Sequence, residues 1–274
     1  MTSYAFPPGG LPGQDQDPSD SEAVFTDAYA VLPAGTMRDI TASNLPGWRD
    51  ARAWILARPL GGFAETFAQY AVELAPGGGS DTPEPDPKAQ AVLFVASGTL
   101  RLTIDGARHD LTAGGYAYLP HTARWQVRNM TDDPARFHWI RKRYTPAPDL
   151  SPPPAFVTSD AAMAPTPMPG TENWATTRFV DPGDMRHDMH VNIVTFQPGG
   201  RIPFAETHVM EHGLYVLEGT ARYLLNTDWV TVGPGDFMWL RAFCPQACIA
   251  TGDKPFRYLL YKDVNRHPDL SLNA

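Results

Sequence analysis

The sequence predicts an all-β protein built from two similar small barrels in tandem. Apolar segments of roughly four to eight residues, such as AVLFVASG and WVTVGPG, are separated by Gly, Pro or Asx breaks. No segment keeps a helical period between caps, and 28 prolines and 23 glycines are spread along the chain. A third observation, an internal repeat, indicates that the chain contains the same barrel twice.

Composition excludes several classes of protein. The 274 residues suit two small domains, and 43% hydrophobic residues are enough to form a core. With 22 Lys and Arg against 30 Asp and Glu, the net charge of −8 argues against partners such as nucleic acids or anionic membranes. The chain shows neither a membrane-spanning apolar run nor the pattern of a signal peptide. Cys244 and Cys248, the only cysteines, make no disulfide framework and fit a cytoplasmic location.

The chain divides into four parts by composition. Residues 1–23 are rich in Pro, Gly, Asp and Ser and predict a mobile N-terminal arm. Residues 24–144 carry the first set of strand signals and predict the first barrel. Residues 145–170 are proline-rich and predict a linker, and residues 171–274 predict the second barrel.

The two β regions match each other at a shift of 121 positions. The matching pairs are Gly98-Thr99 with Gly219-Thr220, Gly114 with Gly235, Phe94-Val95 with Tyr215-Val216, Tyr118-Leu119 with Trp239-Leu240, and Arg136-Phe137 with Arg257-Tyr258. A constant shift over some fifty positions indicates a duplicated domain.

The second copy contains a candidate metal site. Glu206 and His208 lie two residues apart, so on a strand they would share one face. His212 can join them if the chain turns at residues 209–211, and Gln246 on a distant strand can supply a fourth group. One carboxylate with two imidazoles suits Mn, Fe, Zn or Ni, and an amide oxygen shifts the preference towards Mn²⁺. Taken alone, the same residues could also form a solvated edge.

Comparison of the two copies favours the metal site. At the shift of 121, the four candidate ligands fall on Pro85, Pro87, Ala91 and Trp125. All four are lost together, whereas the framework glycines and aromatic residues persist. Scattered surface residues have no reason to change as a set, so we expect one barrel with a site and one structural barrel.

The spacing of these residues is that of the two cupin motifs, with Glu206, His212 and Gln246 in place of the usual residue types. Within the cupins, this set together with YLLYKDVNR at 258–266 closely resembles the (S)-ureidoglycine aminohydrolase family of bicupins, over residues 24–268. The resemblance implies two tandem cupin (double-stranded β-helix, jelly-roll) barrels and a Mn²⁺ site held by Glu206, His208, His212 and Gln246. It also implies hydrolysis of (S)-ureidoglycine to (S)-ureidoglycolate and ammonia, a step of purine and allantoin catabolism.

Three further residues match substrate-facing positions of that family: Tyr223, Tyr258 and Lys262. The substrate would be a small ureido carboxylate, so Lys262 could orient its carboxylate or move a proton, and the phenols could bind its ureido group. Glu206 would be both metal ligand and proton acceptor. The alternatives are an exposed lysine at a strand end and two tyrosines that merely line the barrel.

Other functions and residues remain open at this point. A metal-dependent bicupin dioxygenase and a non-catalytic small-molecule-binding bicupin are the alternatives, and another divalent first-row metal could replace Mn²⁺. His190 and Asn192 could line the mouth of the pocket, but such residues more often face solvent, which is the expectation here. His138 is expected to lie at the surface or at an interface. Because open sheet edges need covering, we expect a homo-oligomer, at least a dimer.

Overall fold

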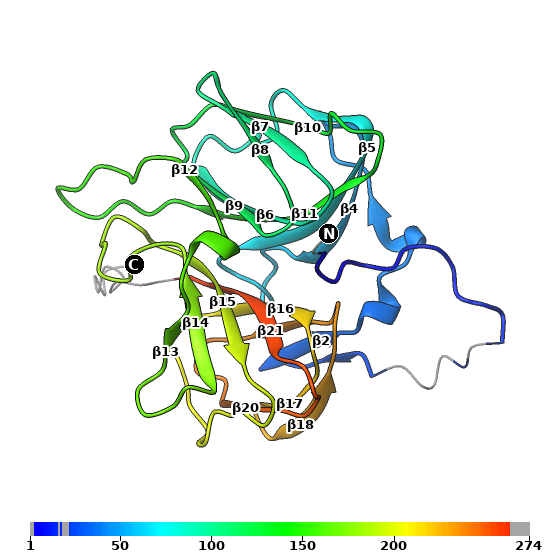
Figure 1. Ribbon diagram of the computed structural model, residues 1–274, viewed down its shortest axis with the longest axis vertical. Coiled ribbons are helices and arrows are strands. Elements are labelled where there is room, and N and C mark those ends of the chain that lie inside the picture. The colour runs from blue at the N-terminus through cyan, green and yellow to red at the C-terminus, as the bar shows by residue number, and fades with distance from the viewer. Residues whose placement is uncertain (1–2, 16, 18–21, 264–274) are drawn as a thin grey trace.

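The computed structural model describes residues 3–15, 17 and 22–263, and its regular structure is almost entirely β (Figure 1). The first barrel is formed by a ten-stranded sheet. Its strands are β3 (Ala42–Ser43), β4 (Arg49–Ala57), β5 (Ala68–Ser80), β6 (Ala89–Ser97), β7 (Leu100–Ile104), β8 (Ala107–Leu111), β9 (Gly115–Leu119), β10 (Trp125–Arg128), β11 (Ala135–Arg143) and β12 (Phe156–Ser159).

The second barrel combines an eight-stranded and a three-stranded sheet. The larger sheet contains β1 (Val24–Phe25), β2 (Tyr29–Leu32), β13 (Thr166–Pro167), β14 (Trp174–Arg178), β15 (His190–Phe196), β16 (His212–Glu218), β19 (Phe237–Leu240) and β21 (Phe256–Lys262), and the smaller contains β17 (Ala221–Leu225), β18 (Asp228–Val232) and β20 (Gln246–Ala250). Three short 3-10 turns, η2 (Ala34–Thr36), η3 (Asp39–Thr41) and η4 (Asp160–Ala162), lie between strands. Among the described residues no helix is long and apolar enough to cross a membrane.

The predicted repeat is visible in the strands. β7 and β8 have the same lengths as β17 and β18, each displaced by 121 residues. The pairing register repeats as well, because Ala91 pairs with Leu119 in the first barrel and His212 pairs with Leu240 in the second. The all-β fold with a duplicated barrel is therefore confirmed.

The barrels exchange their edge strands, which differs from the expected division of the chain. β2 precedes the first barrel but pairs with β19 of the second, whereas β12, within the expected linker, pairs with β9 of the first (Figure 1). β9 and β19 are equivalent strands of the two copies. Each would otherwise expose unpaired backbone groups at a sheet edge, and the exchanged strand satisfies them.

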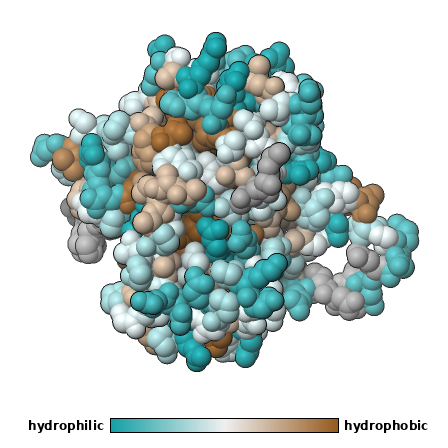
Figure 2. Space-filling view, in the orientation of Figure 1, coloured by the Kyte–Doolittle hydropathy of each residue, from teal (hydrophilic) through white to brown (hydrophobic). Residues whose placement is uncertain are grey.

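Three hydrophobic cores result from this arrangement. One fills each barrel, and a third lies between the two sheets, where Trp54 and Phe94 of the first barrel meet Tyr215 and Tyr261 of the second. Side chains alternate along a strand, so β21 places Tyr258 inside the second barrel and Tyr261 between the barrels. The face seen in Figure 2 is mainly hydrophilic, with hydrophobic residues in a few patches.

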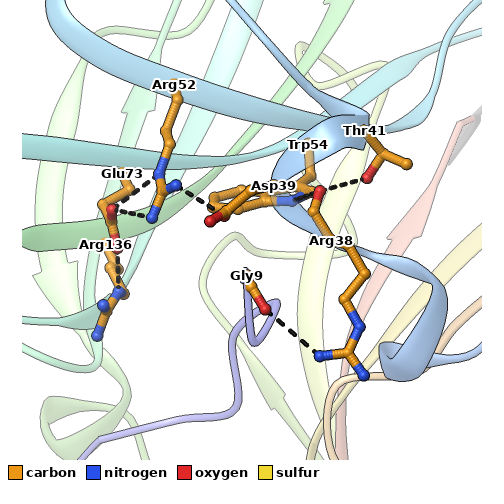
Figure 3. A network of polar contacts seen from close by, with 8 residues as sticks. All are labelled: Gly9, Arg38, Asp39, Thr41, Arg52, Trp54, Glu73 and Arg136. Atoms are coloured by element: carbon orange, nitrogen blue, oxygen red, sulfur yellow. Dashed lines mark hydrogen bonds and ion pairs between the residues drawn. The ribbon is translucent and has the colours of Figure 1, made fainter. Parts of the chain in front are cut away.

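The N-terminal segment, expected to be a mobile arm, is anchored in its described part. Tyr4 is buried between the barrels, and its backbone N–H donates to the Ala96 carbonyl at 2.9 Å. Figure 3 shows a second anchor, where Arg38 donates to the Gly9 carbonyl and Arg52 pairs with Asp39. Gly9 has a φ of +61°, a backbone conformation that glycine adopts without strain. The polar composition hid two aromatic side chains, Tyr4 and Phe6, that pack against the core between the barrels.

Candidate functional site

The four predicted ligands come from two segments that are paired through their backbones. Glu206 and Gln246 form an isolated antiparallel bridge, in which each backbone N–H donates to the other's carbonyl at 2.9 Å. The backbone N–H of Phe243 donates to the His208 carbonyl at 2.6 Å, which extends the pairing to the second ligand. Residues 40 positions apart in the sequence are thereby fixed side by side.

The third candidate ligand, His212, reaches the site through a turn. The chain bends at residues 209 and 210, and β16 begins at His212, as the spacing predicts. His212 is 5% exposed and its ring centroid lies 5.1 Å from that of His208. Burial, with smaller contributions from His208 and Lys262, lowers the pKa of His212 to about 3. The imidazole is therefore neutral near pH 7, the form that can donate a lone pair to a metal.

The side chains of the four residues share one neighbourhood. Glu206 Oε1 lies 3.2 Å from His208 Nε2 and 3.4 Å from Gln246 Nε2. Within the described part of the chain, no group of three or more His, Cys, Asp or Glu side chains is arranged so that it could hold a metal ion. The Glu206 carboxylate contacts its neighbours instead of pointing with them at a common centre.

These side chains open into a small polar cavity of about 170 Å³ inside the second barrel. Its wall is built mainly from alternate residues of β14, β15 and β21, which point inward together. The lining includes Trp174, Thr176, Arg178, Asn192, Val194, Glu206, His208, His212, Leu214, Gln246, Tyr258, Leu260 and Lys262. Three of the four catalytic residues predicted from the sequence, Glu206, Tyr258 and Lys262, lie on this wall.

Two cationic side chains line the same cavity as the candidate ligands. Lys262 is the register partner of His212, and Arg178 belongs to the outer strand β14. Burial, followed by repulsion from Arg178, lowers the pKa of Lys262 below its ordinary value. The cavity thus combines a carboxylate and two imidazoles with two cationic side chains.

The two predicted tyrosines have different positions. Tyr258 lines the cavity, whereas the fully buried Tyr223 lies behind Gln246 and donates a 3.1 Å hydrogen bond to its Oε1. Burial raises the pKa of both phenols well above the ordinary value, so both stay protonated. Tyr223 contacts a candidate ligand and is absent from the wall of the cavity.

His190 and Asn192, expected to face solvent, are 2% and 3% exposed. Asn192 lines the cavity, and its Oδ1 is a buried acceptor with no hydrogen-bond partner among the described residues. His190 pairs with Lys262 across the strands, and burial lowers its pKa to about 3. Arg178 was missed as a site residue, and Asn192 was weighed as one but expected to face solvent, although both have the inward parity of Tyr258 and Lys262.

A family comparison accounts for the duplicated architecture. The model of the cupin domain matches residues 70–141 and again residues 192–261, one match in each barrel. The chain belongs to the cupin family. This cupin also has a wider hollow of about 860 Å³ in its first barrel, lined by Pro87 and Trp125 at positions equivalent to two ligands.

Relatives match this chain over both barrels. This cupin is 29% identical over 245 residues to the (S)-ureidoglycine aminohydrolase of Escherichia coli K12, covering 88% of this chain and 90% of the relative. It is 30% identical to the (S)-ureidoglycine aminohydrolase of Arabidopsis thaliana, covering 94% and 83%. Its fold matches the crystal structure of a Pseudomonas aeruginosa protein named for induction by glyoxylate, with a TM-score of 0.92, 62% identity and full coverage of both chains. The last residues of the YLLYKDVNR motif, 264–266, lie outside the described residues.

Proposed function

We propose that this cupin is a metal-dependent (S)-ureidoglycine aminohydrolase, which forms (S)-ureidoglycolate and ammonia in purine and allantoin catabolism. One observation carries the proposal: Glu206, His208, His212 and Gln246 share one small cavity with Lys262 and Arg178. The names of the relatives, matched over most of both chains, support the same activity. Mn²⁺ is the proposed ion, since a carboxylate, two imidazoles and an amide oxygen suit a first-row divalent metal of borderline hardness.

The residues present fit such an ion in their chemistry. His212 is held neutral by burial, and Glu206 Oε1 is the atom on which His208 and Gln246 converge. Gln246 would turn its amide so that Oε1 replaces Nε2 as the group facing the site. When bound, the metal would supply positive charge that orients the substrate and lowers the pKa of water.

The wall of the cavity fits a small ureido carboxylate. Lys262 and Arg178 would bind the substrate carboxylate through charge-assisted hydrogen bonds. The unpartnered Oδ1 of Asn192 would accept a hydrogen bond from the ureido N–H. The phenol of Tyr258, protonated at neutral pH, can donate to the ureido oxygen. Handedness would follow from binding three groups of one carbon at three separate points.

The hydrolysis needs one proton acceptor and one orienting charge. The bond between the α-carbon and the amine breaks, and a bond between that carbon and the water oxygen forms. One proton of the water stays on the new hydroxyl group, and the other leaves with the amine as ammonia. Glu206, which faces the cavity, would accept the proton from water and return it to the leaving amine. Lys262 keeps the carboxylate in place during the exchange.

Elemental analysis coupled to an ammonia-release assay tests the proposal. Purified protein should contain Mn or another first-row divalent metal and release ammonia from freshly prepared ureidoglycine. His208→Ala and His212→Ala should lose metal and activity together, whereas His109→Ala, in the first barrel, should keep both. Full activity in a variant shown to be metal-free would refute the proposal.

Two other functions are distinguished by the same preparation. A bicupin dioxygenase would consume O₂, and a binding module would bind ureidoglycine without releasing ammonia. Lys262, Arg178 and the amide oxygen of Asn192 line one cavity, and this combination favours a small anionic substrate bearing N–H groups.

We also propose a cytosolic homo-oligomer. Cys244 and Cys248 are both free and buried, which fits a reducing compartment. The larger sheet of the second barrel ends at β1 and β13, so another subunit could cover an edge strand. Light scattering coupled to size exclusion would measure the number of subunits.

A further inference from the structure

The loop that connects β4 to β5 in the first barrel packs directly behind the site of the second barrel. Residues 65–67 of this loop contact the neighbours of His212 and Lys262 along their strands. His212 and Lys262 are themselves register partners on β16 and β21, with their side chains directed into the cavity. Since side chains alternate along a strand, the residues flanking them point out of the barrel towards this loop.

The loop binds Glu211, the residue before His212. The Glu211 carboxylate is 5% exposed and accepts hydrogen bonds from the backbone N–H groups of Glu65 and Thr66, both at 2.9 Å. It also accepts from the Thr66 hydroxyl at 2.6 Å and from Trp239 Nε1 at 2.7 Å. Three of these four donors belong to the first barrel. A buried carboxylate with four donors has little freedom to move.

The same loop reaches the residues on either side of Lys262. The Thr66 hydroxyl lies 3.0 Å from the hydroxyl of Tyr261, and the ring of Phe67 stacks on that of Tyr261 with centroids 3.9 Å apart. Asp263 accepts a 3.0 Å hydrogen bond from the Glu211 backbone N–H, which links the two strands behind the cavity. Residues before and after Lys262 are therefore held together with the residue before His212.

Gly213, the residue after His212, completes this contact. A Cβ at position 213 would lie 2.6 Å from Cζ of Phe67, so only glycine allows the aromatic ring to pack against the strand. The first barrel thus contacts both chain neighbours of His212.

The repeat supplies an internal comparison. Gln90 is the counterpart of Glu211 in the first barrel, and it accepts a hydrogen bond from Tyr118, the counterpart of Trp239. Its amide donates to Asp188 of the second barrel, the counterpart of Phe67. The two copies therefore make equivalent contacts across the interface, but only the Glu211 contact borders candidate ligands.

We propose that residues 65–67 of the first barrel are a positioning element for His212 and Lys262, acting through Glu211, Gly213 and Tyr261. The barrel without ligands supplies the rear support that holds the ligand strand and the cationic strand at a fixed separation. The consequence of this positioning for catalysis rests on the function proposed above, but the positioning itself is a property of the interface between the barrels.

The test compares Thr66→Val with Thr66→Ser and with Tyr118→Phe. T66V removes the hydroxyl that contacts Glu211 and Tyr261 while keeping the shape of the side chain. Y118F removes one hydroxyl from the equivalent contact of the other copy. T66V should weaken Mn²⁺ binding by about tenfold, the lower end of the range for residues that orient metal ligands. It should also raise KM more than it lowers kcat, T66S should restore both, and Y118F should change neither.

Hydrogen–deuterium exchange of peptides covering residues 207–216 and 256–262 provides a readout independent of activity. Faster exchange of these peptides in T66V, and not in Y118F, would support the positioning role even if the wild type released no ammonia. That result would count against the proposed function alone. Unchanged exchange in T66V, or equal losses in T66V and Y118F, would overturn the inference while leaving the proposed function intact.

Discussion

A buried histidine between the barrels predicts how stability depends on pH. His138 is fully buried, its ring packs against Tyr215 of the second barrel at 4.2 Å, and neither ring nitrogen has a partner among the described residues. Burial lowers the pKa of His138 from 6.5 to about 3. In the unfolded chain the same imidazole becomes protonated when the pH falls below its ordinary pKa of 6.5. Below pH 6.5 the unfolded state therefore binds more protons than the folded state.

The magnitude follows from the two pKa values. The contribution of His138 to the free energy of unfolding is fully present above pH 6.5. It falls as the pH is lowered and becomes constant below about pH 3, where the folded state is protonated as well. Between pH 7 and pH 5 the loss is about 2 kcal/mol, which corresponds to a fall in Tm of about 4–8 °C for a chain of this size.

His138→Leu isolates this contribution, because leucine fills a similar space and does not titrate. Thermal or urea unfolding at pH 7 and pH 5 should show that the variant loses about 2 kcal/mol less than the wild type over this range. At pH 7 the variant should be at least as stable, since it buries no polar atom without a partner. Parallel losses in the two proteins would refute the reasoning that His138 stays neutral between the barrels.

Three further predictions concern the cavity and the N-terminal segment. Replacing Lys262 or Arg178 by Met should raise KM for ammonia release by about 10–150-fold, the effect of losing a hydrogen bond to a charged group, and an unchanged KM would contradict carboxylate binding there. Tyr223→Phe removes the hydroxyl that contacts the Gln246 amide and that would accept from Nε2 once the amide has turned. The variant should weaken metal binding by about tenfold in a metal titration, whereas an unchanged affinity would mean that the hydroxyl does not position the amide. Tyr4→Ala should lower the free energy of unfolding by about 3–5 kcal/mol without changing KM, which differential scanning calorimetry and kinetics would check.

Local patterns in the sequence predict much of the fold and of the ligand set. Turn residues fix strand lengths, and the repeat at 121 residues fixes which strands of the two copies correspond. The shared face of Glu206 and His208 and the turn before His212 follow from spacing, because a strand has a period of two residues, whereas Gln246 was expected from the family resemblance. These features depend on neighbours in the sequence or on equivalent positions in the other copy.

The exchange of edge strands could not be predicted in this way. β2 and β12 are each four residues long, and their composition is compatible with pairing to either barrel. Which edge they cover depends on how the two sheets are placed relative to each other. That placement is a tertiary property, since it is decided by the packing between the barrels.

The orientation of β15 is a second feature that the sequence does not predict, because this strand is buried on both faces. His190 and Asn192 face the barrel interior, while Val191 and Ile193 pack in the core between the barrels. The sequence HVNIVTF therefore lacks the polar and apolar alternation that marks a half-exposed strand. Because neither face of the strand is exposed, the sequence does not show whether His190 and Asn192 point into the cavity or towards solvent.

Burial on both faces of β16 and β21 also makes the second barrel depend on the first. β16 directs His212 and Leu214 inward, and its other face contributes Tyr215 and Leu217 to the core between the barrels. β21 likewise directs Tyr261 outward against Phe67. A second barrel alone would expose this aromatic face to water and would leave the Glu211 carboxylate without three of its four donors. The first barrel therefore lacks counterparts of the four candidate ligands but supplies three of the four donors to Glu211, the residue before His212.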